Sequence, residues 1–268
     1  MFNLYIRDLV YKLRDKGCYI CNQFAGCILF ADDILLLSGS VIQLEKMLDI
    51  CYDYGINMDI SFNANKFHLI HVGQDYKNEL PLLRLGETLL SWVNEFKYLG
   101  CVIRTGVKLQ VAVDINCRKF LSASYAILQK CAGLSEEILC QIINTRCLPI
   151  LLYGLESFQL SFVQKRRIKV AYNNIVRRIF NLGRFVSVRN VIAFIGAKPA
   201  DIAADERRLL LVHECWFSLS SLLHDCAYIT VNSNVFTNLS FVYDVHVNMS
   251  RNKIKLMVLQ LQTRSLEV

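Results

Sequence analysis

Two adjacent aspartates, Asp32 and Asp33, are the residues of this sequence whose type and setting could support chemistry. They interrupt an otherwise apolar run from Cys27 to Leu37. A buried carboxylate without a partner is costly, so charges in such a run normally have a counter-charge or a metal ion. Paired carboxylates supply the oxygen ligands that hard divalent cations such as Mg²⁺ or Mn²⁺ prefer. The plainer alternative is that both aspartates belong to an exposed reverse turn.

The residues around the aspartates predict a β-hairpin that would display them. The apolar run is too short for a fully buried helix, and each half suits a short strand. We expect strands over residues 26–30 and 34–38, with residues 31–33 at the tip. A rigid hairpin would hold both carboxylates in place for two-metal phosphoryl transfer, in which the ions activate the attacking oxygen and stabilise the leaving one.

The segment Phe30-Ala31-Asp32-Asp33, with its apolar flanks, resembles the catalytic hairpin of reverse transcriptases, in particular those of non-LTR (LINE-type) retrotransposons. Further segments resemble that family in the same order along the chain. They are the opening residues 2–9, residues 63–72 with Lys66 at the position of the family's lysine, the primer-grip-like turn Tyr98-Leu99-Gly100, and residues 149–157 followed by Arg177-Arg178-Ile179. The resemblance covers residues 1–215.

This resemblance implies an α+β fold and a division of the chain. A partial polymerase palm, a hairpin-containing antiparallel sheet with helices, would occupy residues 1–105. A helical, basic, thumb-like region would follow over 106–200, and a helical C-terminal region of unknown role over 201–268.

The resemblance also implies RNA-directed DNA polymerase activity, with an RNA template and a DNA primer as partners. Asp32 and Asp33 would be metal ligands, Lys66 would lie near the leaving pyrophosphate, and the turn at Tyr98, Leu99 and Gly100 would support the primer end. The alternative for Lys66 is a surface lysine at a boundary between a loop and a strand.

The family's polymerase site needs parts that this sequence does not show. A third carboxylate on an earlier strand completes the metal site, and the fingers hold the template and the nucleotide. Both lie upstream of the helix that here begins at Phe2, so we expect the chain alone not to polymerise. Two alternatives remain open: a non-catalytic nucleic-acid-binding remnant, and a decayed element without a function.

The net charge of +7 is concentrated in one segment. Between Ser157 and Ala200 there are nine basic residues and no acidic one. A block of one sign indicates a polyanionic partner, so we expect this segment to contact nucleic acid, the alternative being a solvated face. The residues expected to bind are Lys165, Arg166, Arg167, Lys169, Arg177, Arg178 and Arg184.

Apolar spacing predicts the other elements. We expect an opening helix that ends by Gly17, a helix capped by Ser40 and ended at Gly55, and another that starts after Pro199. Strands are expected over residues 56–62, 67–72, 82–90 and 96–103, and helices over 108–131, 135–152 and 163–182.

The eleven cysteines are odd in number and scattered, which is typical of a reduced protein of the nucleus or cytoplasm. Cys18 and Cys21 form a single C-x-x-C without a second pair, which is a weak metal signal. Two His-acid-Cys triplets suggest zinc, but positions i and i+2 do not share a helix face. The ligands in question are His213, Cys215, His224 and Cys226. No uncharged apolar stretch reaches the roughly 18 to 20 residues of a membrane-spanning helix.

Overall fold

The computed structural model describes residues 2–31, 33–60 and 67–232, and combines helices with small antiparallel sheets. The predicted site residues Asp32 and Lys66 lie outside the described residues. The helices are α1 (Phe2–Leu13), α2 (Val41–Asn57), α3 (Val113–Lys130), α4 (Glu136–Ile142), α5 (Leu148–Leu152), α6 (Phe162–Ile179), α7 (Arg189–Phe194), α8 (Ala200–Trp216) and α9 (Ser221–Asn232), with a π-helical turn η2 (Ile143–Cys147) between α4 and α5.

The strands form hairpins rather than one continuous sheet. The pairs are β1 (Tyr19–Ile20) with β2 (Gln23–Phe24), β3 (Cys27–Phe30) with β4 (Asp33–Leu36), β5 (Leu83–Leu85) with β6 (Thr88–Leu90), and β7 (Glu95–Tyr98) with β8 (Cys101–Arg104), to which β9 (Gln110–Val111) adds a third strand. The mixture of helices and antiparallel strands confirms the α+β class.

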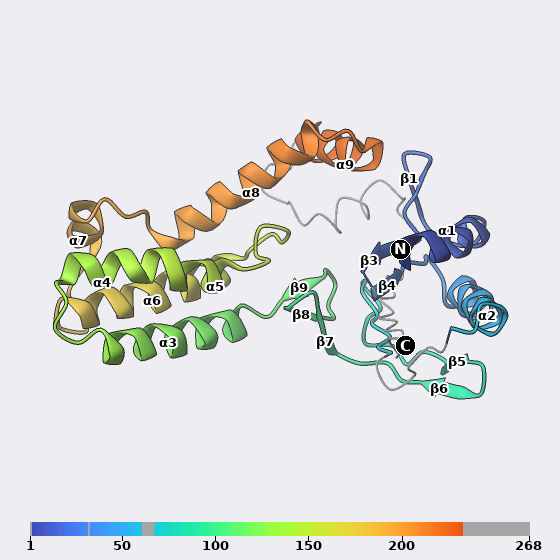
Figure 1. Cartoon of the computed structure of the whole chain (residues 1–268), viewed down its shortest axis with the longest axis horizontal. Coiled ribbons are helices and arrows are strands. Elements are labelled where there is room, and N and C mark those ends of the chain that lie inside the picture. The colour runs from blue at the N-terminus through green and yellow to red at the C-terminus, as the bar shows by residue number, and fades with distance from the viewer. Residues whose placement is uncertain (1, 32, 61–66, 233–268) are drawn as a thin grey trace.

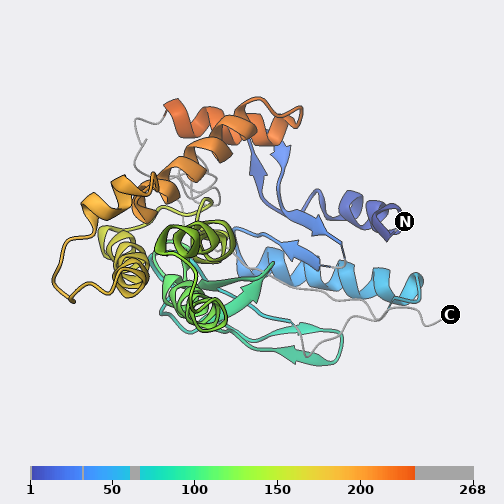
Figure 2. The same cartoon turned by 60° about the vertical axis from the view of Figure 1, so that its left-hand side comes forward.

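The elements gather into two groups that α8 and α9 connect. The small sheets with α1 and α2 form one group, and α3 to α7 form the other (Figure 1). Helix α8 packs against α6 at one end and α9 at the other, and α9 contacts β1. Both views show α9 beside the β1–β2 hairpin (Figure 1 and Figure 2). The end of the described chain therefore returns to its beginning.

The hairpin around the aspartates is confirmed, with one difference in its tip. Phe30 pairs with Asp33, so Asp33 is the first residue of β4 and not part of the tip as expected. Only two residues connect the strands, so Asp33 forms the last pair of the β3–β4 ladder with Phe30. Ala31 lies at φ 49°, in the left-handed region, which costs a residue with a Cβ about 1–2 kcal/mol. This strain lies directly beside the paired aspartates of the sequence.

Strand β4 lies between two hydrophobic cores. Its side chains alternate, as the period of two in a strand requires. Ile34 and Leu36 are buried with α1 and α2 in one core. Leu35, and Leu37 directly after the strand, are buried in a larger core that reaches α3 to α8. The hairpin is thus positioned from both sides by apolar packing.

Around α2 the sequence prediction holds at the start and fails at the end. The Ser40 side chain accepts a 3.2 Å hydrogen bond from the Gln43 N–H, as a cap should. Gly55 does not end the helix, because the hydrogen-bonded turn continues to Asn57 and the Met58 N–H reaches the Tyr54 carbonyl. The strand expected over 56–62 is therefore wrong for its described residues.

The segments expected as one pair of strands, 82–90 and 96–103, instead form two separate hairpins. Residues 82–90 contain the β5–β6 hairpin, and residues 96–103 contain most of β7 and β8. The expected strand over 67–72 is replaced by an extended segment that forms only isolated parallel bridges, Leu69 to Trp92 and Val72 to Gly106. Its side chains at Leu69 and Ile70 are nevertheless fully buried.

The expected helices are present with shifted ends. Helix α3 starts at Val113 rather than residue 108, because β9 pairs with β8 first. Helix α6 is confirmed, and Ser161 and Gln164 form a capping box at its start. Its expected inward residues Ile168, Val176 and Ile179 are buried. No helix in the described part of the chain has the length and apolarity to cross a membrane.

Candidate functional site

The hairpin that begins β4 at Asp33 shares a hydrophobic core with the second region that the sequence singled out, because Leu35 and Leu37 are buried with Phe96 and Tyr98 packs against the same core. Asp33 is half-buried at the start of β4, and Tyr98 is half-buried at the end of β7. Burial, together with smaller contributions from the charges of Asp33 and Cys27, raises the pKa of Tyr98 to about 12. The predicted metal-ligand hairpin and the primer-grip-like turn are therefore neighbours.

The primer-grip-like turn is a tight two-residue connection. Tyr98 pairs with Cys101 across it, so Leu99 and Gly100 form the tip. Both tip residues have positive φ, 45° at Leu99 and 83° at Gly100. This is the geometry of a type I′ hairpin turn, which glycine adopts without strain and leucine does not.

Residues from the helical group hold this turn in place. The Tyr153 hydroxyl donates a 2.8 Å hydrogen bond to the Leu99 carbonyl. Gly154, at φ 69°, lies so close to Cys101 that a Cβ built there would collide with the cysteine Sγ. The predicted segment 149–157 thus packs directly on the turn.

Asn116 anchors Tyr153 in turn. Its side chain is buried on α3, and its Nδ2 donates to the carbonyls of Tyr153 at 2.9 Å and Leu151 at 3.3 Å. These carbonyls lie at the C-terminal end of α5, where intrahelical donors run out. Sequence reasoning missed Asn116. Its signal is an amide four residues before Phe120, at the spacing of the buried face of α3.

The basic residues of α6 divide between two environments. Lys165 forms hydrogen-bonded ion pairs with Asp205 at 2.6 and 2.7 Å, and Lys169 pairs with Asp201 at 3.1 Å. Both aspartates lie on α8, so these lysines bind α8. The arginines expected to contact nucleic acid, Arg166, Arg167 and Arg178, are exposed.

The two remaining arginines of the predicted set lie at the end of α6 and beyond it. Arg177 is half-buried, and its Nε donates a 2.9 Å hydrogen bond to the Val186 carbonyl. Arg184 is exposed, with its guanidinium 5.9 Å from the ring centroid of Phe185. The ring itself is almost fully exposed.

The structure does not gather the residues suggested for zinc. Cys215 and Cys226 are buried, while the rings of His213 and His224 pack against Phe217 and Trp216. Across residues 2–31, 33–60 and 67–232, no three His, Cys, Asp or Glu side chains are grouped as for a metal ion.

The thiols share one property. All eleven cysteines are free. Burial raises the pKa of Cys18 and Cys140 to about 11 and that of Cys27 to about 12. These three thiols therefore stay protonated at neutral pH, in the form that reacts slowly with oxidants and metals.

One comparison with known proteins finds a relative. The retrovirus-related Pol polyprotein from type-1 retrotransposable element R1 of Bradysia coprophila is 24% identical over 229 residues. The match covers 78% of this chain and 22% of that polyprotein. This chain is similar to part of a retrotransposon Pol polyprotein. The relationship is distant, and it supports a region related to reverse transcriptase.

The other two comparisons return nothing. No protein-family model matches the chain, and no solved structure matches it.

Proposed function

We propose that this chain is part of the reverse transcriptase of a non-LTR retrotransposon. Residues 1–105 form a palm-like region, residues 106–200 a basic thumb-like region, and residues 201–268 a region whose role we leave open. The supporting observation is that the aspartate hairpin and the β7–β8 turn share one core, through Leu35 and Phe96, and that the charge of Asp33 acts on Tyr98, because a polymerase needs its metal ligands near the turn that holds the primer end. The similarity to a retrotransposon polyprotein supports the same proposal.

In this proposal each predicted site residue has a role. The Asp33 carboxylate is a hard oxygen donor, half-exposed on a rigid hairpin, and so fits Mg²⁺ or Mn²⁺. Asp33 and Asp32 together would hold the ion, which favours ionisation of the primer 3′ hydroxyl and stabilises the leaving group. Lys66 would protonate the pyrophosphate, while Tyr98, Leu99 and Gly100 position the primer end against an RNA template.

We place polymerisation within a larger assembly, since two-metal chemistry in the family uses a third carboxylate and a nucleotide-binding fingers region. Primer extension on an RNA template with Mg²⁺ tests this, comparing the chain with an Asp32→Ala, Asp33→Ala variant. We expect no extension by either protein. Extension by the unaltered chain that the double substitution abolishes would show that the chain carries a complete polymerase site. That result would support polymerase activity and would reject the need for a larger assembly.

The position of the primer end can be tested without catalysis. A DNA primer annealed to RNA would carry a photo-crosslinking group on its 3′-terminal nucleotide. We expect adducts on the turn between β7 and β8, at residues 98–101. The turn between β5 and β6, which also carries a glycine in the left-handed region, Gly86, is the internal control. Adducts of equal yield on both turns would contradict the proposal.

A second candidate function is nucleic-acid binding without chemistry. The exposed arginines on α6, which have no acidic neighbours between Ser157 and Ala200, favour it. Binding of RNA or DNA that weakens steeply with salt, by a protein that shows neither extension nor the primer crosslink, is the result that would select this candidate.

A further inference from the structure

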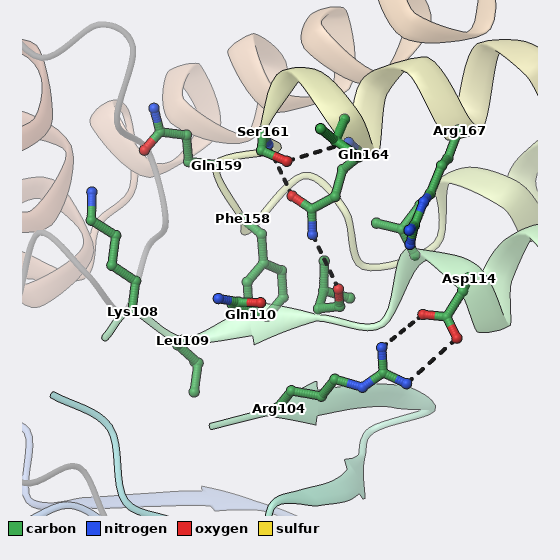
Figure 3. A pocket seen from close by; sticks show the side chains of 13 residues that line it. Arg104, Lys108, Leu109, Gln110, Asp114, Phe158, Gln159, Ser161, Gln164 and Arg167 are labelled. Atoms are coloured by element: carbon green, nitrogen blue, oxygen red, sulfur yellow. Dashed lines mark hydrogen bonds and ion pairs between the residues drawn. The ribbon is translucent and has the colours of Figure 1, made fainter. Parts of the chain in front are cut away.

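A cationic pocket lies between the β8–β9 edge and the start of α6, away from the β3–β4 hairpin. Its volume is about 490 Å³, within the range of roughly 300–1,000 Å³ that small-ligand sites occupy. Three of its lining residues are cations, Arg104, Lys108 and Arg167, and one is an acid, Asp114 (Figure 3). The lining therefore carries an excess of positive charge.

The acidic residue in the pocket, Asp114, already forms ion pairs with arginines. Arg104 donates from Nη1 to Asp114 Oδ1 at 2.8 Å and from Nη2 to Oδ2 at 3.4 Å, and its Nε donates to Glu95 at 2.8 Å. The hydrogen bonds from Arg104 lower the pKa of Asp114, so the carboxylate stays ionised near neutral pH. Arg118 approaches the same carboxylate at 3.5 Å. Asp114 thus neutralises Arg104, and the formal charge of the lining as a whole remains positive.

Arg167 and Lys108 approach the pocket from opposite sides. Arg167 points from α6 toward the Arg104–Asp114 pair, and Lys108 lies across the pocket before β9 (Figure 3). Within the part of the chain that the structure describes, Arg167 forms no ion pair. An arginine guanidinium offers a planar fork of donors that suits phosphate oxygens.

Hydrogen bonds of Gln164 fix the side of the pocket between Arg167 and Lys108. The Gln164 Oε1 accepts from the Ser161 N–H at 2.9 Å, and its Nε2 donates to the Val111 carbonyl at 3.4 Å. This amide ties the first turn of α6 to β9. The first turn of α6 contains no acidic residue. The pocket is therefore built by two elements in fixed relation, and its cationic lining is not offset by the helix that forms its rim.

We propose that this pocket binds a phosphate group of a nucleic-acid strand, with Arg167 and Lys108 as the direct ligands. The cavity is larger than one phosphate, so an attached sugar can enter with it. The inference rests on the proposed function only for the choice of a nucleic-acid strand as the carrier of the phosphate. It concerns binding and not polymerisation, so its test needs no Mg²⁺ and no activity.

The test is competition at constant ionic strength. A fluorescent single-stranded oligonucleotide is bound to the full chain, and its anisotropy is followed while inorganic pyrophosphate replaces chloride. The variants are Arg167→Gln and Lys108→Gln. The matched control is Arg84→Gln, which removes the same charge from an exposed position on β5, outside both the pocket and the basic segment. Circular dichroism and the thermal midpoint establish that each variant is folded, and Lys108→Gln serves alone if Arg167→Gln is not.

We expect pyrophosphate to compete saturably with the oligonucleotide for the unaltered chain and for Arg84→Gln. Each pocket variant should bind the oligonucleotide about 5- to 10-fold more weakly, with a salt slope reduced by about one, and should lose the saturable competition. Equal weakening by all three substitutions without saturation would overturn the pocket in favour of a diffuse surface field. Saturable pyrophosphate binding without any effect on the oligonucleotide would reject the strand as the ligand.

The result separates this inference from the proposed function. Loss of the primer crosslink at residues 98–101 with intact pocket competition would reject the palm assignment alone. The reverse pattern would reject the pocket alone.

Discussion

The Tyr153 hydroxyl donates a 2.8 Å hydrogen bond to the Leu99 carbonyl, and so joins the end of α5 to the tip of the β7–β8 turn. Tyr98, which begins the same turn, packs against the core that contains Leu35 of the aspartate hairpin, and the charge of Asp33 contributes to its raised pKa. The helical group is thus connected through one turn to the hairpin that carries the aspartates.

Tyr153→Phe should lower the free energy of unfolding by about 1 kcal/mol, because it removes one hydrogen bond and leaves the ring in place. Urea unfolding measures the change. Tyr125→Phe on the exposed side of α3 is the control, and should have little effect. Equal losses in the two variants would show that the contact with Leu99 contributes nothing specific.

Gly154→Ala should destabilise the protein more than Gly196→Ala. Both glycines have left-handed φ angles, 69° and 64°, so both substitutions incur a backbone cost of about 1–2 kcal/mol. Only at Gly154 would the new Cβ collide with Cys101, whereas Gly196 has no neighbour within 4 Å. Thermal unfolding should show the difference, and adding Cys101→Ala should restore part of it.

Asn116→Ala should cost about 1–3 kcal/mol, because it leaves the carbonyls of Leu151 and Tyr153 without their buried donor. Chemical denaturation compares this variant with Asn190→Ala, which alters an exposed amide on α7. Faster amide exchange at residues 99–101 in the Asn116 variant would show that its anchor extends to the turn. Unchanged exchange there would contradict that chain of contacts.

Tyr98 should remain protonated well above its ordinary pKa of 10.0. The folded state holds this proton more tightly than the unfolded state, so the resulting stability is complete below pH 10 and is lost as pH rises toward about 12. Asp33→Asn should lower the pKa of Tyr98, since it removes a nearby negative charge. Tyrosine ring carbon shifts in an NMR titration measure this, with Asp53→Asn on the exposed face of α2 as control.

The two kinds of basic residue on α6 should separate in nucleic-acid binding. Arg166→Gln with Arg178→Gln should weaken binding several-fold and flatten its salt dependence. Lys165→Gln with Lys169→Gln removes the same charge, but these lysines are paired with α8, so binding should change less. The paired lysines should contribute at most about 1 kcal/mol each to stability. Equal effects of the two double variants on binding would assign it to net charge alone.

Local patterns in the sequence were sufficient for most elements. The apolar run around the paired aspartates predicted the β3–β4 hairpin, and Ser40 predicted the start of α2. These patterns failed at the end of α2. Gly55 is typical of a helix end, yet the backbone hydrogen bonds of α2 continue past it. The start of α3 also moved, because the pairing of β9 with β8 takes the residues before it.

Contacts between distant residues were beyond the sequence alone. Nothing near Lys165 or Lys169 shows that their partners Asp205 and Asp201 lie 40 and 32 residues away. The shared core of the aspartate hairpin and the β7–β8 turn was expected only through the family resemblance. Asn116 was missed, because the spacing of its neighbours predicts an apolar face and a single amide does not disturb that pattern.

The alternation along β4 has a mechanical consequence. Ile34 and Leu36 face one core and Leu35 and Leu37 the other, so the strand that begins at Asp33 is a common wall of both halves of the molecule. Neither half can melt without exposing one face of that wall, which couples the two halves into a single cooperative unit. A force applied to the helical half would therefore be transmitted to the β3–β4 hairpin.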